Sequence, residues 1–306
     1  MTELNQQEII ARINKLRKEK NAVILTHNYQ LGEVQDIADY VGDSLGLSIK
    51  ARDVDCDVIV FCGVKFMAET AKILSPDKTV LLPVETAGCP MADMADAEQL
   101  RRLKREHPNA VAVAYVNSTA EVKTEVDICC TSANAAKVVA SIPKDKEVIF
   151  LPDRNLGANV ARQLGRELIL WPGFCPTHMR VSKEMIEQRK REFPDAAVMI
   201  HPECPPEVVE TADAALSTGG MLKFARETDA KQIIVATEVG IIHRLKKENP
   251  DKLFIPVSEQ AICPTMKLIE LHDVLRSLEN METEMILAPE VIAKAKAPII
   301  KMIETV

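Results

Sequence analysis

The chain has 306 residues, of which 47% are hydrophobic and only 4% aromatic. A chain of this length can bury a large core and divide into two or three domain-sized units. The formal net charge of −7 argues against a nucleic-acid partner, because nucleic-acid surfaces need clustered Lys and Arg. The first residues lack the basic-then-apolar order of a signal peptide, and no apolar run approaches the ~20 residues of a membrane helix. We therefore expect a cytoplasmic protein with no membrane partner, whose cysteines are reduced.

The first expected elements are a helix over residues 6–20 and a strand over residues 22–26. Similar strand-like apolar runs recur at residues 110–114 and 196–200, at distances of 88 and then 86 residues. Each run leads into a polar triplet, and these triplets are His27-Asn28-Tyr29, Tyr115-Val116-Asn117 and His201-Pro202-Glu203. Matching spacings of this length indicate an internal threefold repeat.

Three further sets of landmarks keep nearly the same register. Strand-like runs occur at residues 58–61, 148–151 and 233–236, and one hydroxyl residue precedes a helical run in each unit: Ser44, Ser132 and Thr218. A Cys-Pro dipeptide then closes each unit, at Cys89, Cys175 and Cys263, with spacings of 86 and 88 residues. Each unit therefore reads as four strands that alternate with three helices and end in a Cys-Pro turn.

Short apolar strands that alternate with helices are typical of buried parallel sheets with right-handed crossovers. We predict an α/β fold of three similar Rossmann-like lobes, each a parallel sheet flanked by helices, related by pseudo-threefold symmetry around a central active site. The expected units are residues 1–102 with the N-terminal helix, residues 103–188 and residues 189–280. A helix within residues 281–306 is expected to pack on the first lobe and against the N-terminal helix.

Ligands of open parallel sheets bind outside the carboxyl ends of the strands, and the triplets and cysteines all follow strands. If the lobes surround one axis, Cys89, Cys175 and Cys263 converge on it and can hold one metal centre. Three thiolates without a close fourth cysteine suit either zinc or an iron–sulfur cluster with one open iron. Proline is favoured in the first turn of a helix, so each cysteine should face a positive helix end that favours thiolate.

Other cysteines have no threefold counterparts, and we interpret them as structural fillers: Cys56, Cys62, Cys129, Cys130 and Cys204. Cys204 follows Glu203 and could lie near the chamber. His178 comes three residues after Cys175, and both a contact to a metal ligand and a purely structural role stay open for it.

The polar triplets offer groups for proton chemistry. His27 and His201 occupy equivalent positions, and each stands two residues before a second polar group, Tyr29 or Glu203. In the second unit, Asn117 occupies the position equivalent to Tyr29 and Glu203. Such phenols, amides and carboxylates are plausible proton carriers and hydrogen-bond partners. The hydroxyl residues that precede helices are explained either as plain helix N-caps or as parts of anion sites.

These residues together resemble the quinolinate synthase family over essentially the whole chain. The segments that carry the resemblance are Thr26–Tyr29, Val41–Ser44, Phe61–Glu69, Gly88–Pro90, Tyr115–Asn117, Thr131–Ser132, Trp171–Cys175, His201–Glu203, Ser217–Gly219 and Ile262–Pro264. The resemblance implies a [4Fe-4S] cluster held by Cys89, Cys175 and Cys263, with an open iron that acts as a Lewis acid. It also implies the condensation of iminoaspartate (iminosuccinate) with dihydroxyacetone phosphate to quinolinate, phosphate and water, in de novo NAD biosynthesis.

The resemblance further implies roles for single residues. Tyr29, Glu203, His27 and His201 are the expected catalytic residues. The expected substrate contacts are His27, Ser44, Tyr115, Val116, Asn117, Ser132, His201, Pro202, Glu203 and Thr218. An enzyme that supplies iminoaspartate is a candidate partner. Some relatives carry a C-terminal Cys-x-x-Cys that this chain lacks, so redox regulation through such a pair does not carry over. A zinc-dependent lyase and a non-catalytic iron–sulfur sensor are the alternatives.

Overall fold

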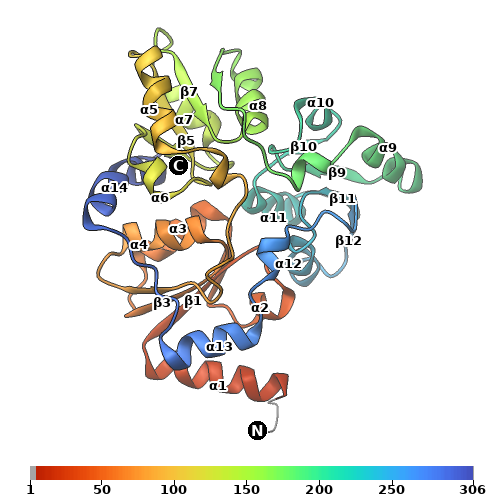
Figure 1. Ribbon diagram of the computed structural model, residues 1–306. Helices are drawn as coiled ribbons and strands as arrows, with labels where there is room; N and C mark the ends of the chain where they lie inside the picture. Colours follow the sequence, from red (N-terminus) through yellow and green to blue (C-terminus); the bar gives the residue numbers. More distant parts are fainter. Residues whose placement is uncertain (1–4, 306) are drawn as a thin grey trace.

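The computed structural model describes residues 5–305 and contains three four-stranded parallel sheets. All three sheets share one strand order, in which the second strand of the unit lies at the edge and is followed by the first, third and fourth: β2-β1-β3-β4, β6-β5-β7-β8 and β10-β9-β11-β12. Figure 1 shows the sheets and their helices as three lobes that meet in the middle of the molecule. The predicted α/β fold of three similar lobes is therefore confirmed.

The elements follow the predicted alternation in every lobe. The first lobe contains β1 (Ala22–His27), α2 (Gly32–Asp36), β2 (Tyr40–Gly42), α3 (Ser44–Asp53), β3 (Val58–Cys62), α4 (Lys65–Leu74) and β4 (Thr79–Leu81). The second contains β5 (Val111–Tyr115), α6 (Ala120–Lys123), β6 (Ile128–Cys130), α7 (Ala135–Ser141), β7 (Val148–Leu151), α8 (Arg154–Leu164) and β8 (Ile169–Leu170). The third contains β9 (Ala197–Ile200), α10 (Pro206–Val209), β10 (Ala214–Ala215), α11 (Thr218–Glu227), β11 (Gln232–Ala236), α12 (Ile241–Glu248) and β12 (Leu253–Pro256).

The other elements connect or flank these lobes. They are α1 (Gln6–Glu19), the 3₁₀ turn η1 (Ala92–Met94), α5 (Ala97–Glu106), η2 (His178–Arg180), α9 (Lys183–Glu192), η3 (Pro264–Lys267), α13 (Leu271–Asn280) and α14 (Pro289–Glu304). All residues of β3 and β7 are buried, which explains why these strands read as continuous apolar runs instead of alternating ones. The buried strands place the chain that follows them at the centre of the molecule.

The terminal helices do not pack as expected. The main packing partner of α1 is α13, whereas α14 lies against α4 and α3 of the first lobe and against α6 and β6 of the second (Figure 1). The expectation that the two terminal helices pack together is therefore wrong. The apolar face of α14, including Ala295, Ile299 and Met302, is fully buried between the two lobes, so the C-terminal helix ties these lobes together.

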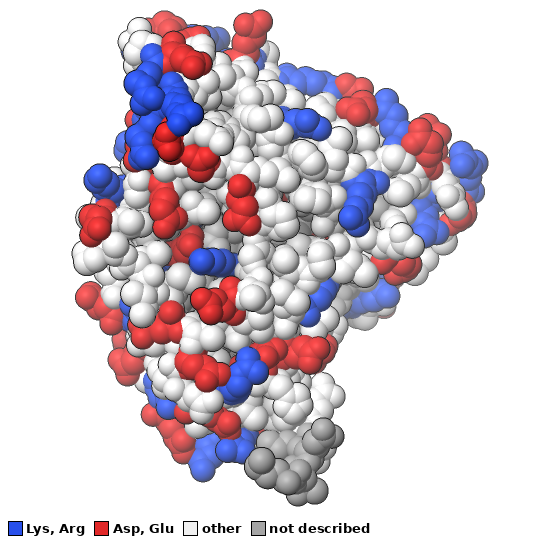
Figure 2. All heavy atoms as spheres, viewed as in Figure 1, with Lys and Arg blue, Asp and Glu red and all other residues white. Residues whose placement is uncertain are grey.

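The surface shows mixed charge. On the face shown in Figure 2, acidic and basic side chains are interspersed, and one group of basic side chains gathers over α5, beside acidic ones. Within residues 5–305, every helix is too short or too polar to span a bilayer. The cytoplasmic location stays a prediction.

Asn134 offers a test of how α14 is held. Its buried amide donates to the carbonyls of Met302 (2.9 Å) and Thr305 (3.2 Å) and accepts from the amide of Thr131 (2.8 Å). Asn134→Ala should lower the free energy of unfolding by about 2–3 kcal/mol, because buried backbone groups lose their partners. Denaturant unfolding measures the effect, with the exposed Lys137→Ala on the same helix as control. A loss no larger than that of the control would show that these bonds do not hold α14.

Candidate active site

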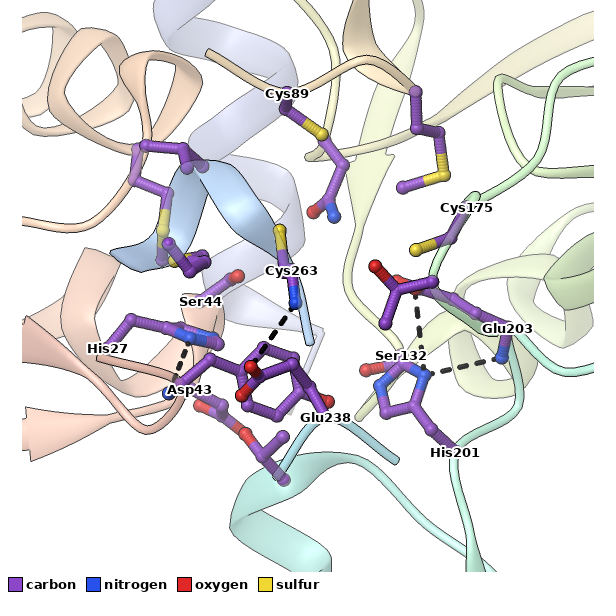
Figure 3. A pocket seen from close by; sticks show the side chains of 18 of the residues that line it. His27, Asp43, Ser44, Cys89, Ser132, Cys175, His201, Glu203, Glu238 and Cys263 are labelled. Carbon is purple, nitrogen blue, oxygen red and sulfur yellow. Dashed lines mark hydrogen bonds and ion pairs between the residues drawn. The ribbon is translucent and has the colours of Figure 1, made fainter. Parts of the chain in front are cut away.

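One cavity lies where the three lobes meet. Residues at or just beyond the ends of β1, β5 and β9 line it, together with residues from the helix starts and the Cys-Pro turns (Figure 3). It brings together these predicted site residues: His27, Tyr29, Ser44, Cys89, Tyr115, Asn117, Ser132, Cys175, His201, Glu203, Thr218 and Cys263. Residues at equivalent positions of the three repeats therefore line one shared chamber instead of three separate sites.

Two of the predicted contacts do not line this cavity. Val116 is buried, and its amide donates to the carbonyl of Cys130 (2.8 Å). Pro202 lines a separate groove beside α8 and α10, and its carbonyl accepts a hydrogen bond from Asn159 (2.9 Å). Val116 and Pro202, the middle residues of the second and third triplets, therefore do not reach the cavity.

The hydroxyl residues lie at helix starts without capping them. Asp43 is the N-cap of α3 and Ser217 is the N-cap of α11, so Ser44 and Thr218 are the first residues inside their helices. The plain N-cap explanation is therefore wrong for these two residues. Their hydroxyls are available to the cavity, where the helix N-termini favour negatively charged groups.

The three Cys-Pro turns deliver their cysteines to the same region of the cavity (Figure 3). Cys89, Cys175 and Cys263 are partly exposed, whereas the other five cysteines are buried. Each turn leads into a short 3₁₀ turn instead of an α-helix. Burial raises the pKa of Cys89 to about 12 and that of Cys175 well above its ordinary value. The expectation that a helix end favours thiolate is therefore not met, and a bound cation would have to supply the positive charge.

Two arrangements of ligands are present. The sulfur of Cys175, a ring nitrogen of His178 and a carboxylate oxygen of Glu203 lie within 4.8 Å of one another. Among the described residues this is the one such group, so the three Cys-Pro sulfurs are not all that close together. Thiolates that share one zinc ion lie within about 4 Å of one another, because each Zn–S bond is about 2.3 Å long. As they lie in the structure, the three cysteines are therefore not spaced to share one zinc ion.

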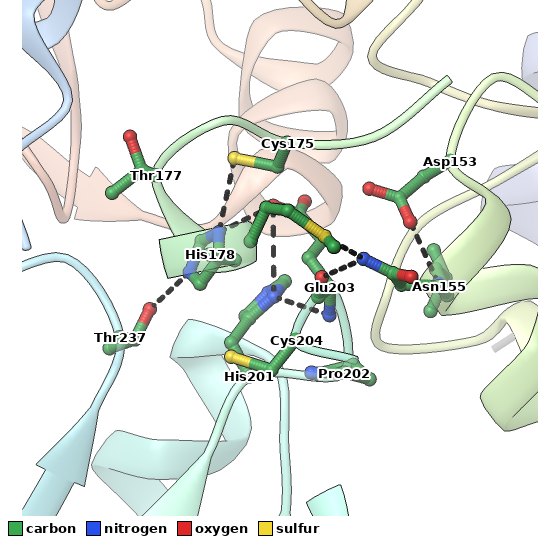
Figure 4. A network of polar contacts seen from close by, with 12 residues as sticks. Asp153, Asn155, Cys175, Thr177, His178, His201, Pro202, Glu203, Cys204 and Thr237 are labelled. Carbon is green, nitrogen blue, oxygen red and sulfur yellow. Dashed lines mark hydrogen bonds and ion pairs between the residues drawn. The ribbon is translucent and has the colours of Figure 1, made fainter. Parts of the chain in front are cut away.

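A continuous chain of hydrogen bonds crosses the chamber. The Tyr29 phenol and the Thr237 hydroxyl are 2.5 Å apart, and Thr237 lies 2.8 Å from Nε2 of His178. Nδ1 of His178 lies 2.7 Å from Oε2 of Glu203, and the Tyr115 phenol donates to Oε1 of Glu203 (2.5 Å). Figure 4 shows the central part of this chain. His178 therefore contacts both a predicted metal ligand, Cys175 (3.2 Å from its Nδ1), and the carboxylate, which resolves the role left open for it.

Burial and neighbouring groups set the protonation states of the residues in and around this hydrogen-bond chain. Although burial alone would raise the pKa of Glu203, His201, His178 and the hydrogen bond from Tyr115 hold it well below its ordinary value. Burial lowers the pKa of both His27 and His201 to about 3. Burial and the Glu203 carboxylate raise the pKa of the phenols of Tyr29 and Tyr115 well above the ordinary value. At neutral pH the Glu203 side chain is therefore ionised, the imidazoles of His27 and His201 are neutral, and the phenols of Tyr29 and Tyr115 keep their protons.

Sequence reasoning missed Thr237 and Glu238, which directly follow β11. Glu238 lines the cavity and is fully buried, and its carboxylate accepts from the amides of Gly240 (2.7 Å) and Cys263 (3.2 Å). Its ion pair with Lys267 (2.9 Å) offsets the cost of a buried charge. A Cβ on Gly240 would lie 2.6 Å from Nζ of Lys267, so only glycine fits beside this pair. Thr237 and Glu238 directly follow strand β11, and this position could have identified them from the sequence.

The remaining cysteines lie in the core. Cys56, Cys62, Cys129 and Cys130 belong to the main hydrophobic cluster, as expected of structural fillers. Cys204 is fully buried in the core of the third lobe and does not line the cavity, although it directly follows the cavity residue Glu203.

A buried chamber with titratable groups, placed at the strand ends of three α/β lobes, is typical of an enzyme active site. A family model described as "Quinolinate synthetase A protein" matches residues 11–304. A quinolinate synthase of Dehalococcoides mccartyi is 55% identical over 301 residues, which cover 98% of this chain and 99% of that protein. A quinolinate synthase of a Geobacter species is 52% identical over 300 residues, covering 98% of each chain. The chain belongs to the quinolinate synthase family, and it is an enzyme of that family.

The raised phenol pKa values predict an alkaline response. The chain has three tyrosines, and Tyr40 is the one outside the chamber. In a Tyr40→Phe variant, phenolate absorbance should not appear near about pH 10, where free tyrosine ionises, while the protein is folded. Because the unfolded chain releases these protons more easily, the stability from the protonated phenols is present below about pH 10 and is lost as the pH rises. A pH titration followed by difference absorbance and circular dichroism tests this, and phenolate formation in the folded protein near pH 10 would contradict it.

Proposed function

We propose that this chain is a quinolinate synthase that condenses iminoaspartate (iminosuccinate) with dihydroxyacetone phosphate in the biosynthesis of NAD. Quinolinate, one phosphate and two waters are the products. The observation that carries the proposal is the single chamber that three cysteines from three lobes share with neutral imidazoles, phenols and the carboxylate of Glu203. The names of the relatives agree with this reaction.

The chamber suits substrates that carry carboxylate and phosphate groups. Ser44 and Thr218 start helices α3 and α11, whose free amides and dipoles attract anions. Neutral His27 and His201 can donate hydrogen bonds to carboxylate or carbonyl oxygens. Favourable positive potential can therefore come from helix ends in a chain whose net charge is −7.

Cys89, Cys175 and Cys263 are the proposed ligands of a [4Fe-4S] cluster. The three sulfurs are not all close enough together to share one metal ion, and the raised thiol pKa of Cys89 and Cys175 makes cation binding and proton release interdependent. Such a cluster, with one iron that has no protein ligand, would supply a Lewis acid for loss of water. The chain of hydrogen bonds beside it would handle the protons.

Glu203 is the proposed proton acceptor of the site. It is ionised, lies inside the cavity, and is connected on one side to Tyr115 and on the other through His178 and Thr237 to Tyr29. Tyr29 keeps its proton and can donate it to a leaving group at the far end of this chain. Protons can thus move between the two ends while enclosure by three lobes keeps a hydrolysable imine away from bulk water.

A zinc enzyme is the second candidate. The cluster of Cys175, His178 and Glu203 has three ligand types that zinc accepts and a spacing that suits one ion. In that case Cys89 would not be a ligand. An enzyme that supplies iminoaspartate remains a proposed partner, because the imine is short-lived in water.

Metal analysis separates the two candidates. Protein purified without oxygen should contain about four irons and matching sulfide per chain and should form quinolinate from the two substrates. Cys89→Ser should lose iron, sulfide and turnover together, whereas the buried Cys56→Ser should keep all three. A colourless protein with one zinc, which Cys89→Ser retains, would favour the zinc enzyme and contradict the cluster.

Thr237→Val tests the hydrogen-bond chain. Valine fills the same space but cannot connect Tyr29 with His178, so kcat should fall by about 10²-fold while the metal content is unchanged. Thr237→Ser should restore most of the rate because it restores the hydroxyl. Steady-state kinetics over a range of pH measure both variants, and wild-type turnover in Thr237→Val would exclude proton transfer through this hydroxyl.

A further inference from the structure

We propose that Asn28 is a positioning residue that makes the Thr218 hydroxyl a hydrogen-bond donor directed into the chamber, and that Arg244 fixes Asn28 for this role. The proposal deepens the proposed function, since it assigns Thr218 to an acceptor oxygen of an anionic substrate group. It concerns the seam between the first and third lobes, where α12 packs on α2 (Figure 1).

The three side chains form a linear array. Nη1 of Arg244, on α12, donates to Oδ1 of Asn28 (3.0 Å). Nδ2 of Asn28 donates to Oγ1 of Thr218 (2.9 Å). Asn28 is fully buried and Thr218 is 3% exposed, so bulk water does not compete for these bonds. Arg244 also donates to the carbonyl of Val41 and pairs with Glu248 (2.6 Å), which holds its guanidinium in place.

The chemistry of arginine determines the orientation of the amide. A guanidinium has donors and no acceptor, so only the oxygen of Asn28 can face Arg244. The NH₂ group of Asn28 then has to face Thr218. The Thr218 oxygen consequently accepts a hydrogen bond from behind, and its own proton is directed elsewhere.

That proton has no acceptor among the described residues. Thr218 is the first residue of α11, and the N-cap function belongs to Ser217, whose hydroxyl accepts from the amide of Gly220 (3.2 Å). Thr218 lines the cavity. A hydroxyl with its acceptor side occupied and its proton free favours an oxygen of a carboxylate or phosphate over a group that itself donates.

The arrangement has no counterpart in the other two lobes. The residues equivalent to Asn28 in the other triplets are Val116 and Pro202, and neither has an amide side chain. Ser44 and Ser132, the residues equivalent to Thr218, line the same cavity. Asn28 therefore distinguishes one of three equivalent hydroxyls as a dedicated donor.

Asn28→Asp is the sharpest test because it keeps the size and shape of the side chain and reverses one hydrogen bond, while adding one charge. Aspartate still accepts from Arg244, but it cannot donate to Thr218, so the threonine proton turns toward the new carboxylate and away from the chamber. We expect the KM for one of the two substrates to rise by about 10–100-fold with kcat changed by less than about threefold, the effect of losing a hydrogen bond to a charged group. Equilibrium binding of dihydroxyacetone phosphate, and of succinate as a dicarboxylate probe, should weaken for the corresponding anion.

A double-mutant cycle separates this effect from the added charge. Thr218→Val should raise the same KM, and Asn28→Asp should add little in the Thr218→Val background, since the hydroxyl it acts through is gone. Simple repulsion by the new carboxylate would persist in that background, so additive effects would overturn the proposal. Lys247→Ala, which removes a surface pair with Asp36 across the same seam, is the control for loosened lobes.

Two further outcomes would overturn the role of Asn28, and a third would separate it from the proposed function. An unchanged KM and unchanged binding in a folded Asn28→Asp variant would overturn the role of Asn28, as would a wild-type protein that binds neither anion. If wild type binds one anion and Asn28→Asp weakens that binding, but no quinolinate forms, the proposed function fails and the inference about Asn28 stands.

Discussion

The buried carboxylate of Glu203 is the interaction on which the arrangement of the chamber depends. A charge with 4% exposure is costly unless hydrogen bonds satisfy it. Tyr115 from the second lobe and His178 from the Cys175 turn supply those bonds at 2.5 and 2.7 Å, and the carbonyl of Glu203 accepts from Asn155 on α8 (3.0 Å). The same bonds that stabilise the charge also dock the third lobe on the second, so closure of the chamber and the protonation state of its carboxylate are coupled.

The repeat made the fold predictable. Strands of a parallel sheet are buried on both faces, so each unit carries readable apolar runs, and three units in one register predict three like sheets and one meeting point. The cysteines and first-strand triplets could be predicted for the same reason, because they follow strands at equivalent positions. Val116 and Pro202 were included with the triplets, but the chain bends or turns directly after β5 and β9, and these two residues do not line the cavity.

Other features depend on contacts between residues far apart in sequence, which spacing does not reveal. His178 and Thr237 belong to the site because they hydrogen-bond to each other and Thr237 hydrogen-bonds to Tyr29. Tyr29 lies more than 100 residues from either in the sequence. Glu238 can be buried because Lys267 reaches it from a different turn. The packing position of α14 could not be predicted either, since its apolar face could pack in any complementary groove. The hydrogen bonds that hold α14 to the second lobe come from one side chain, Asn134, which no sequence pattern marks.

Triplication supplies three equivalent positions, but a reaction between two different substrates needs a site without threefold symmetry. Divergence of the residues at those positions provides the difference. The first-strand ends offer His27, Tyr115 and His201, and the positions two residues later offer a phenol, an amide and a carboxylate. The three Cys-Pro cysteines are alike in all units, so the proposed ligands are equivalent while the polar groups around them differ. An anion held at one lobe therefore meets a different proton donor from an anion held at the next, which gives each substrate one orientation.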